Sequence, residues 1–159
     1  MAAGSVSVEA ERRGLVGRLV GDAVAKAAEL PAHPDVEPGL AELARDGHRL
    51  AVLTNSGADA GRSTLEAAGL AQHFEAVLGV DAVRSFKPHP STYAHACEAL
   101  GAAPARIMLV AVHQWDTTGA KRAGLRTAWI NRDGEPFSPA ADEPDVRATD
   151  LRDLARLLR

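Results

Sequence analysis

One lysine in this chain stands in a setting that is typical of a contact with an anion. Lys87 lies in the stretch Ser85–Tyr93 (SFKPHPSTY), directly before Pro88 and just ahead of a predicted helix. Its ammonium group is a compact positive charge with three hydrogen-bond donors. Two other polar clusters, residues 53–57 (LTNSG) and 113–116 (HQWD), also follow apolar runs. Three such clusters in one small chain predict a site for a small anion or a small organic acid.

Each cluster contributes side chains that could bind or transform such a substrate. The candidates for catalysis are Thr54, Lys87 and Asp116. The candidates for substrate binding are Asn55, Ser56, Tyr93, His113 and Trp115. These residue types also have structural roles, because polar side chains cap helices and aromatic rings fill cores. Both interpretations stay open for Thr54, Asn55, Tyr93 and Trp115, and Asp116 is expected to be a helix N-cap whether or not it takes part in catalysis.

The elements that position these clusters alternate between strands and helices. Short apolar runs without alternation predict buried strands over residues 49–54, 74–80, 107–112 and 126–131. Glycines and capping residues predict helices over residues 36–45, 59–69, 91–101, 116–124 and from 148 onward, with Ser91 and Thr149 as caps. Residues 132–147, which contain three prolines, predict an exposed loop. This order predicts an α/β fold with a Rossmann-like parallel sheet flanked by helices.

The three polar clusters all follow predicted strands. The carboxyl ends of parallel strands meet at one edge of a sheet, and ligands of such folds bind beyond that edge. Helix N-termini point their positive dipole ends toward the same place. We therefore expect the clusters to form one site.

Composition narrows the classes of function. The chain has 159 residues, 46% of them hydrophobic, which suits one domain with its own core. A net charge of −3 argues against a nucleic-acid partner, and the first 30 residues lack the unbroken apolar stretch of a membrane span or signal peptide. The single Cys97 cannot form an internal disulfide, which suits a cytoplasmic protein. The spacing of the histidines predicts no metal site, and no cofactor is expected.

Residues 1–30 favour a helix. Apolar residues recur at three- and four-residue spacing from Leu15 to Leu30, which predicts a helix over residues 8–30 despite three glycines. In the competing interpretation, residues 15–20 form a strand with Asp22 at its end. We divide the chain into an N-terminal helical segment, residues 1–30, and an α/β core, residues 31–159.

The three clusters resemble motifs of the haloacid dehalogenase superfamily, in particular its 2-haloacid dehalogenase branch. Residues 53–57 resemble the second family motif, residues 86–93 (FKPHPSTY) the third, and residues 112–132, beginning VHQWD, the fourth. The resemblance implies hydrolysis of a small 2-haloacid, in which an aspartate on the first strand forms an ester that water then hydrolyses.

The same resemblance implies roles for several candidates. Thr54 and Asn55 would bind substrate oxygens, and Lys87 would stabilise the nucleophile and the developing negative charge. Asp116 would position the lysine or the water, and Tyr93 would line the site.

The first motif of the family, an apolar strand that ends in the nucleophilic aspartate, has no match in the sequence. Residues 1–30 instead resemble the last helix of the family's cap domain. We therefore expect the first strand and most of the cap to be missing and activity to be impaired. A gap would then separate the strands at 49–54 and 107–112. The open edges would be covered by the N-terminal helix or by a second copy in a homodimer.

Two alternatives remain open. One is an inactive relative that binds a small anion or another protein, and the missing nucleophile favours it. The other is a phosphatase of the same superfamily. Val112 opposes the phosphatase, because it stands where phosphatases carry a second acidic residue for magnesium.

Overall fold

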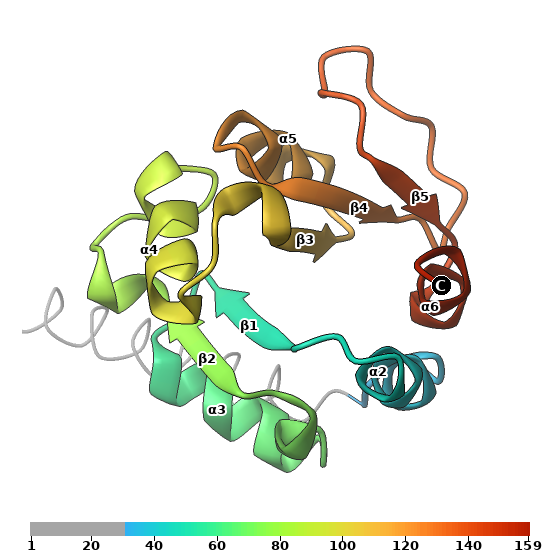
Figure 1. Cartoon of the computed structure of the whole chain (residues 1–159), viewed down its shortest axis with the longest axis horizontal. Coiled ribbons are helices and arrows are strands. Elements are labelled where there is room, and N and C mark those ends of the chain that lie inside the picture. The colour runs from blue at the N-terminus through green and yellow to red at the C-terminus, as the bar shows by residue number, and fades with distance from the viewer. Residues whose placement is uncertain (1–30) are drawn as a thin grey trace, which may run out of the picture. The chain divides into compact units, whose positions relative to one another are not determined.

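Five short parallel strands form the centre of the part of the chain that the computed structural model describes, residues 31–159 (Figure 1). β1 (Ala51–Thr54) pairs with β2 (Ala76–Gly79) from Ala51↔Ala76 to Thr54↔Gly79. A second sheet has the order β3-β4-β5, with β3 spanning Met108–Ala111, β4 Arg126–Ile130 and β5 Val146–Ala148. The predicted parallel α/β architecture is confirmed. The predicted helix over residues 8–30, and the alternative strand ending at Asp22, lie outside the described residues.

β5 corrects the prediction that residues 132–147 form only an exposed loop. It pairs with β4 in parallel, from Ala128↔Val146 to Ile130↔Ala148. The strand has three residues and follows a proline-containing segment, so its sequence carries no periodic signal. The strand is stabilised by its pairing with the buried β4 and not by the β-propensity of its own residues.

Helices and 3₁₀ turns connect the strands. The α-helices are α2 (Val36–Arg45), α3 (Ala58–Ala67), α4 (Pro90–Leu100), α5 (Gln114–Arg122) and α6 (Leu151–Leu157). The 3₁₀ turns are η1 (Ala71–His73), η2 (Val80–Ala82) and η3 (Pro104–Arg106). No helix of the described part is long and apolar enough to cross a membrane.

Three predicted caps were wrong by one to three residues. α4 begins after His89, whose Nδ1 accepts a hydrogen bond from the Ser91 backbone N–H at 3.3 Å. α5 begins after His113, so Asp116 lies in the first turn and is not its N-cap. α6 begins after Asp150, whose carboxylate accepts from the Asp153 N–H at 2.7 Å. For α4 and α6 a neighbouring polar side chain makes the capping hydrogen bond, whereas the His113 side chain makes none at α5.

Apolar residues form two buried clusters. One joins β4, β5 and α6 through Ala128, Ile130, Ala148 and Leu154. The other contains Tyr93, Ala120 and Leu125, with the partly buried Leu53, Cys97, Ile107, Leu109 and Ala123 packed against it. The second cluster lies next to the carboxyl ends of β1 and β3 and supports the predicted site.

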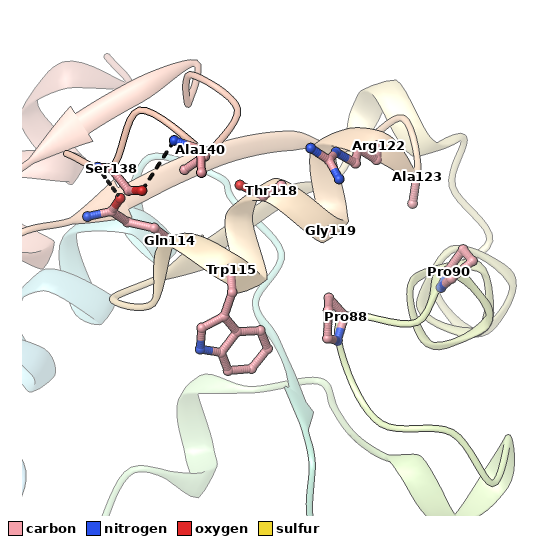
Figure 2. Close-up of a pocket in the computed structure, with 11 residues that line it drawn as sticks. Pro88, Pro90, Gln114, Trp115, Thr118, Gly119, Arg122, Ala123, Ser138 and Ala140 are labelled. Carbon is pink, nitrogen blue, oxygen red and sulfur yellow. Dashed lines mark hydrogen bonds between the residues drawn. The ribbon is translucent and has the colours of Figure 1, made fainter.

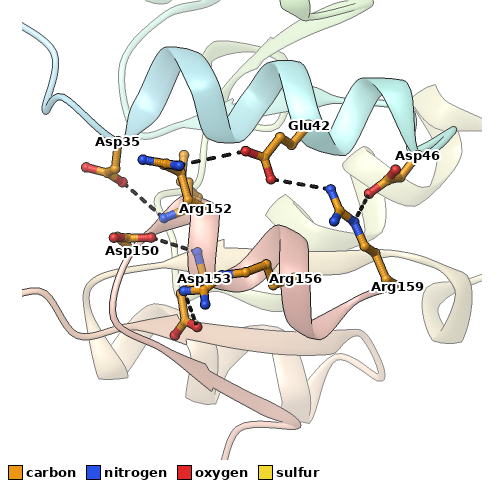
Figure 3. Close-up of polar contacts among 9 residues, drawn as sticks. Asp35, Glu42, Asp46, Asp150, Arg152, Asp153, Arg156 and Arg159 are labelled. Carbon is orange, nitrogen blue, oxygen red and sulfur yellow. Dashed lines mark hydrogen bonds and ion pairs between the residues drawn. The ribbon is translucent and has the colours of Figure 1, made fainter.

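The contact between α2 and α6 is close and carries several ion pairs (Figure 3). A Cβ on Gly39 would lie 2.5 Å from Leu151 Cβ, so only glycine allows this approach of the helices. Asp35 accepts hydrogen bonds from Arg132 Nη2 at 2.7 Å and from the Leu151 N–H at 3.0 Å. The hydrogen bond from Arg132 is the main cause that lowers the pKa of Asp35 to about 2. This carboxylate therefore joins the residue before α2 to Arg132 and to the start of α6.

β1 and β3 do not pair with each other. Among residues 31–159, β1 pairs only with β2, and β3 pairs only with β4 and not with any other strand. Each of the two strands therefore has one edge without a ladder partner in this part of the chain.

Candidate functional site

The site is built around the backbone of Lys87, which the end of β1 holds in place. The Lys87 N–H donates to Asn55 Oδ1 at 2.7 Å, and Asn55 Nδ2 donates to the Lys87 carbonyl at 3.4 Å. The Asn55 amide thus uses both its donor and its acceptor on one residue 32 positions away. Asn55 positions the lysine in this structure.

The side chain of Lys87 forms an ion pair with Asp116. Lys87 Nζ lies 2.5 Å from Asp116 Oδ2, and the two side chains are only 12% and 4% exposed. Lys87 is therefore not the exposed lysine that its loop position suggests. Removing it would leave a buried carboxylate without its partner, which is a costly change.

Tyr93 completes the coordination of this carboxylate. Its hydroxyl donates to Asp116 Oδ1 at 2.8 Å, and its ring is fully buried. Burial raises the pKa of Tyr93, and the hydrogen bond to Asp116 and its negative charge raise that pKa further. Both carboxylate oxygens are thus engaged, one by a cation and one by a phenol. Tyr93 contacts Asp116 in this structure instead of lining an open pocket.

Side-chain hydrogen bonds hold the loop that follows β1. Thr54 Oγ1 accepts from the Ser56 N–H at 3.0 Å, and Ser56 is exposed at the turn. At the start of α3, the Ala58 N–H donates to Asp81 Oδ1 at 3.2 Å. Sequence reasoning missed Asp81, because nothing local links it to a helix 23 residues earlier.

His113 and Trp115 come just before Asp116 in the sequence, His113 as the residue before α5 and Trp115 in its first turn. Their rings stack, with centroids 5.5 Å apart and an interplanar angle of 15°. Trp115 is 44% exposed, and the neighbouring Val112 and Phe86 are 47% and 67% exposed. Large apolar side chains at a charged site suit a small organic acid, or the packing of another segment against this surface.

A groove lies on the outer face of α5 (Figure 2). It has a volume of about 600 Å³ and is lined by Pro88, Trp115, Thr118, Gly119 and Ser138, among others. Lys87 and Asp116 do not line it. The groove is therefore adjacent to the charged pair and does not contain it.

The described residues hold no group of three His, Cys, Asp or Glu side chains that could bind a metal ion. Four positions before Asp116 stands Val112, an apolar side chain. Asp116 itself already contacts Lys87 and Tyr93.

Parallel strands with a buried lysine–aspartate pair at their carboxyl ends define a Rossmann-like α/β protein with a charged site. The chain belongs to the haloacid dehalogenase-like hydrolase family, whose model matches residues 7–130. The predicted family is thereby confirmed.

Individual relatives fall mainly in one branch. An (S)-2-haloacid dehalogenase of Pseudomonas sp. (strain YL) is 37% identical over 123 residues, which cover 77% of this chain and 53% of the relative. A phosphoserine phosphatase of Thermus thermophilus is 42% identical over 125 residues, covering 78% of this chain and 50% of the relative. The chain spans about half the length of these curated relatives.

A solved structure is similar in fold. It is an L-2-haloacid dehalogenase from Xanthobacter autotrophicus with chloropropionic acid covalently bound, and its TM-score is 0.78 at 33% identity. The match covers 83% of this chain and 62% of that protein.

Proposed function

We propose that residues 31–159 are the core of a 2-haloacid dehalogenase-type hydrolase that holds the substrate, and that this core is catalytically impaired without a carboxylate from elsewhere. The observation that carries the proposal is the buried pair of Lys87 and Asp116. Among residues 31–159, Asp116 is the only acidic side chain within 4.0 Å of the Lys87 ammonium. The ammonium keeps further donors for a second carboxylate.

Asp116 is a poor candidate for the nucleophile. It is buried, and each of its oxygens already accepts a hydrogen bond, from Lys87 or from Tyr93. A carboxylate with both oxygens engaged and little exposure cannot approach a substrate carbon. Its role in the proposal is to orient the lysine.

In the proposed reaction, the incoming carboxylate attacks C2 of a 2-haloacid. A carbon–oxygen bond forms while the carbon–halogen bond breaks, and the halide leaves with the electron pair. Water then adds to the ester carbonyl, and the ester cleaves to the 2-hydroxy acid, the free carboxylate and a proton. Lys87 would balance the negative charges of nucleophile and substrate, and Thr54 and Ser56 would offer hydroxyl groups to substrate oxygens.

The relative from Thermus thermophilus makes a phosphatase the second candidate. A magnesium-dependent phosphatase needs several oxygen ligands for a hard cation. Here Val112 takes the position of a second carboxylate, and Asp116 is held by Lys87 and Tyr93. These features support our proposal of a dehalogenase over a phosphatase.

The test measures binding and turnover separately on the full chain. L-2-chloropropionate should quench the fluorescence of the half-exposed Trp115, measured against a Trp115→Phe variant, while chloride release stays at background. Lys87→Met should lose the binding. Lys121→Met is the matched control, because Lys121 forms a similar ion pair with Asp145 at 2.9 Å on the surface.

A second variant covers the case in which Lys87→Met does not fold. Lys87→Met combined with Asp116→Asn removes the uncompensated charge and should fold but not bind. Binding that is unchanged in this variant would refute the site. Chloride release well above background that disappears in Asp22→Asn would refute the impairment. Magnesium-stimulated hydrolysis of phosphoserine without haloacid binding would favour the phosphatase.

A further inference from the structure

The groove on the outer face of α5 has the size and lining of a small-ligand site. Its volume of about 600 Å³ lies within the range of about 300 to 1,000 Å³ that is usual for such sites. Its apolar walls include Pro88, Pro90 and Ala140. The half-exposed indole of Trp115 lines it near the start of the helix (Figure 2). We call this feature the α5 groove.

One wall of the α5 groove is the loop before β5, which hydrogen bonds hold along the helix. Gln114 Oε1 accepts from the Ser138 N–H at 2.8 Å, and Thr118 Oγ1 accepts from the Asp142 N–H at 3.0 Å. Arg122 Nε donates to Asp142 Oδ2 at 2.7 Å. The three helix residues are spaced four apart, so they lie on one side of α5. The groove is therefore a preformed feature of the fold.

The polar side chains of the α5 groove offer hydrogen-bond donors. Arg122 has five N–H donors, of which one on Nε and one on Nη2 bond Asp142, so three remain. The hydroxyl groups of Thr118 and Ser138 each accept one bond from a backbone N–H, and neither donates to a residue within 31–159. Asp142 itself does not line the groove. A ligand that presents an anionic acceptor group complements these donors.

The two ends of the α5 groove differ in chemistry. Trp115 lies in the first turn of α5 and Arg122 in the last, with their Cα atoms about 10 Å apart along the helix axis. Their spacing is close to two full turns, so both residues lie on the same side of the helix, and both line the groove. A ligand that reaches both has a flat apolar ring at one end and an anionic group at the other.

We propose that the α5 groove binds a small aromatic carboxylic acid, with its ring against Trp115 and Pro88 and its carboxylate at Arg122. The lining of the groove defines this ligand, and Lys87 and Asp116 do not contribute to that lining. The site is therefore separate from the charged pair. It does not depend on hydrolase activity, so the two proposals can fail separately.

Binding is measured on the full chain by ¹H–¹⁵N NMR, with 3-phenylpropionate as the probe. The chain has two tryptophans, whose indole N–H signals are assigned with Trp115→Phe. The Trp115 signal should shift with a dissociation constant of about 1 mM or below. The Trp129 signal should not shift, because that indole is buried and donates to the Val112 carbonyl at 2.8 Å.

Two control compounds separate the contributions of the ring and of the charge. 3-Phenylpropionamide keeps the ring but has no charge, and propionate keeps the charge but has no ring. Each should bind about tenfold more weakly than 3-phenylpropionate or less, because each makes only one of the two contacts.

Matched protein variants locate the binding. Arg122→Met removes the guanidinium and should weaken binding about tenfold. Lys121→Met is its control, because Lys121 also pairs with a surface aspartate, at 2.9 Å, but does not line the groove. Ala140→Phe should fill the groove and abolish binding, whereas Ala60→Phe adds the same ring at an exposed position of α3 and should leave binding unchanged. If Arg122→Met does not fold, Ala140→Phe and the control compounds still decide.

Four outcomes would overturn the proposal. An unchanged Trp115 signal at ten times the expected dissociation constant would show that the groove does not bind the acid. Equal binding of 3-phenylpropionate and its amide would remove the role of Arg122. Binding that survives Arg122→Met but disappears when Lys87→Met is combined with Asp116→Asn would assign the acid to the charged pair. A dimer that dissociates in Ala140→Phe would assign the groove to a second copy of the chain.

Discussion

The buried phenol of Tyr93 gives the most direct check of the site, because it is the single tyrosine of the chain. Its ionisation can be followed by the absorbance of tyrosinate without interference from another residue of this type. Burial and the hydrogen bond to Asp116 raise its pKa above the ordinary value of 10.0. The folded protein should show no tyrosinate signal at about pH 10 to 11, and the signal should appear only on unfolding.

The raised pKa also predicts a loss of stability with a defined sign. The unfolded chain releases the phenolic proton near pH 10, whereas the folded chain retains it, so the free energy of unfolding falls as the pH rises above that value. With the unfolded pKa at 10.0, the loss between pH 10 and 11 is about 1 kcal/mol. Urea unfolding of the native chain and of Tyr93→Phe isolates this contribution, because all other titrating groups cancel in the difference.

Tyr93→Phe should itself cost about 2 kcal/mol at neutral pH, since a hydrogen bond to a buried carboxylate is lost while the ring keeps its packing. A tyrosinate midpoint near pH 10 in the folded chain would refute the buried pairing. An identical pH dependence in both proteins would refute it as well.

Two further changes test the packing around the site. Asp35→Asn should weaken the contact with Arg132 and remove a stabilisation that is present above about pH 4 and lost as the pH falls toward 2. The free energies of unfolding of the two proteins should therefore differ by about 2.5 kcal/mol near neutrality and become equal at low pH, measured by acid unfolding. Gly119→Ala should destabilise by at least 1 kcal/mol in thermal melts although alanine favours helices, because its Cβ would lie 2.5 Å from Pro88 Cβ and 2.7 Å from the Tyr93 hydroxyl; a stabilised Gly119→Ala protein would contradict this packing.

Much of the fold could be predicted because its signals are local. Apolar runs gave four strands, and glycines with positive φ at Gly47, Gly69 and Gly101 follow the predicted helices. The strand β5 could not be predicted, because three residues contain no period and only the pairing with β4 stabilises them.

Three of the predicted site residues lie together in the structure, but their contacts could not be predicted, and their role in a functional site stays a prediction. Sequence motifs indicated Lys87, Asp116 and Tyr93, and the structure brings these three together. Lys87 is buried by its ion pair with Asp116, and its backbone is hydrogen-bonded by the Asn55 side chain. Both contacts join residues about 30 positions apart, so no local sequence pattern predicts them. Asp116 lies in the first turn of α5 and not at its cap, because the helix begins directly after His113.

The separation of β1 from β3 has a consequence for how the protein unfolds. The two sheets share no backbone ladder in residues 31–159 and are joined by side chains, through Leu53 and Leu109 near Tyr93 and through the ion pair of Lys87 with Asp116. Backbone ladders couple the opening of neighbouring strands, whereas side-chain contacts couple it more weakly, and proteins open in such local units. The amides of β1 and β2 should therefore exchange with solvent as one group and those of β3 to β5 as another, so that the charged site lies at the junction of two separately opening halves.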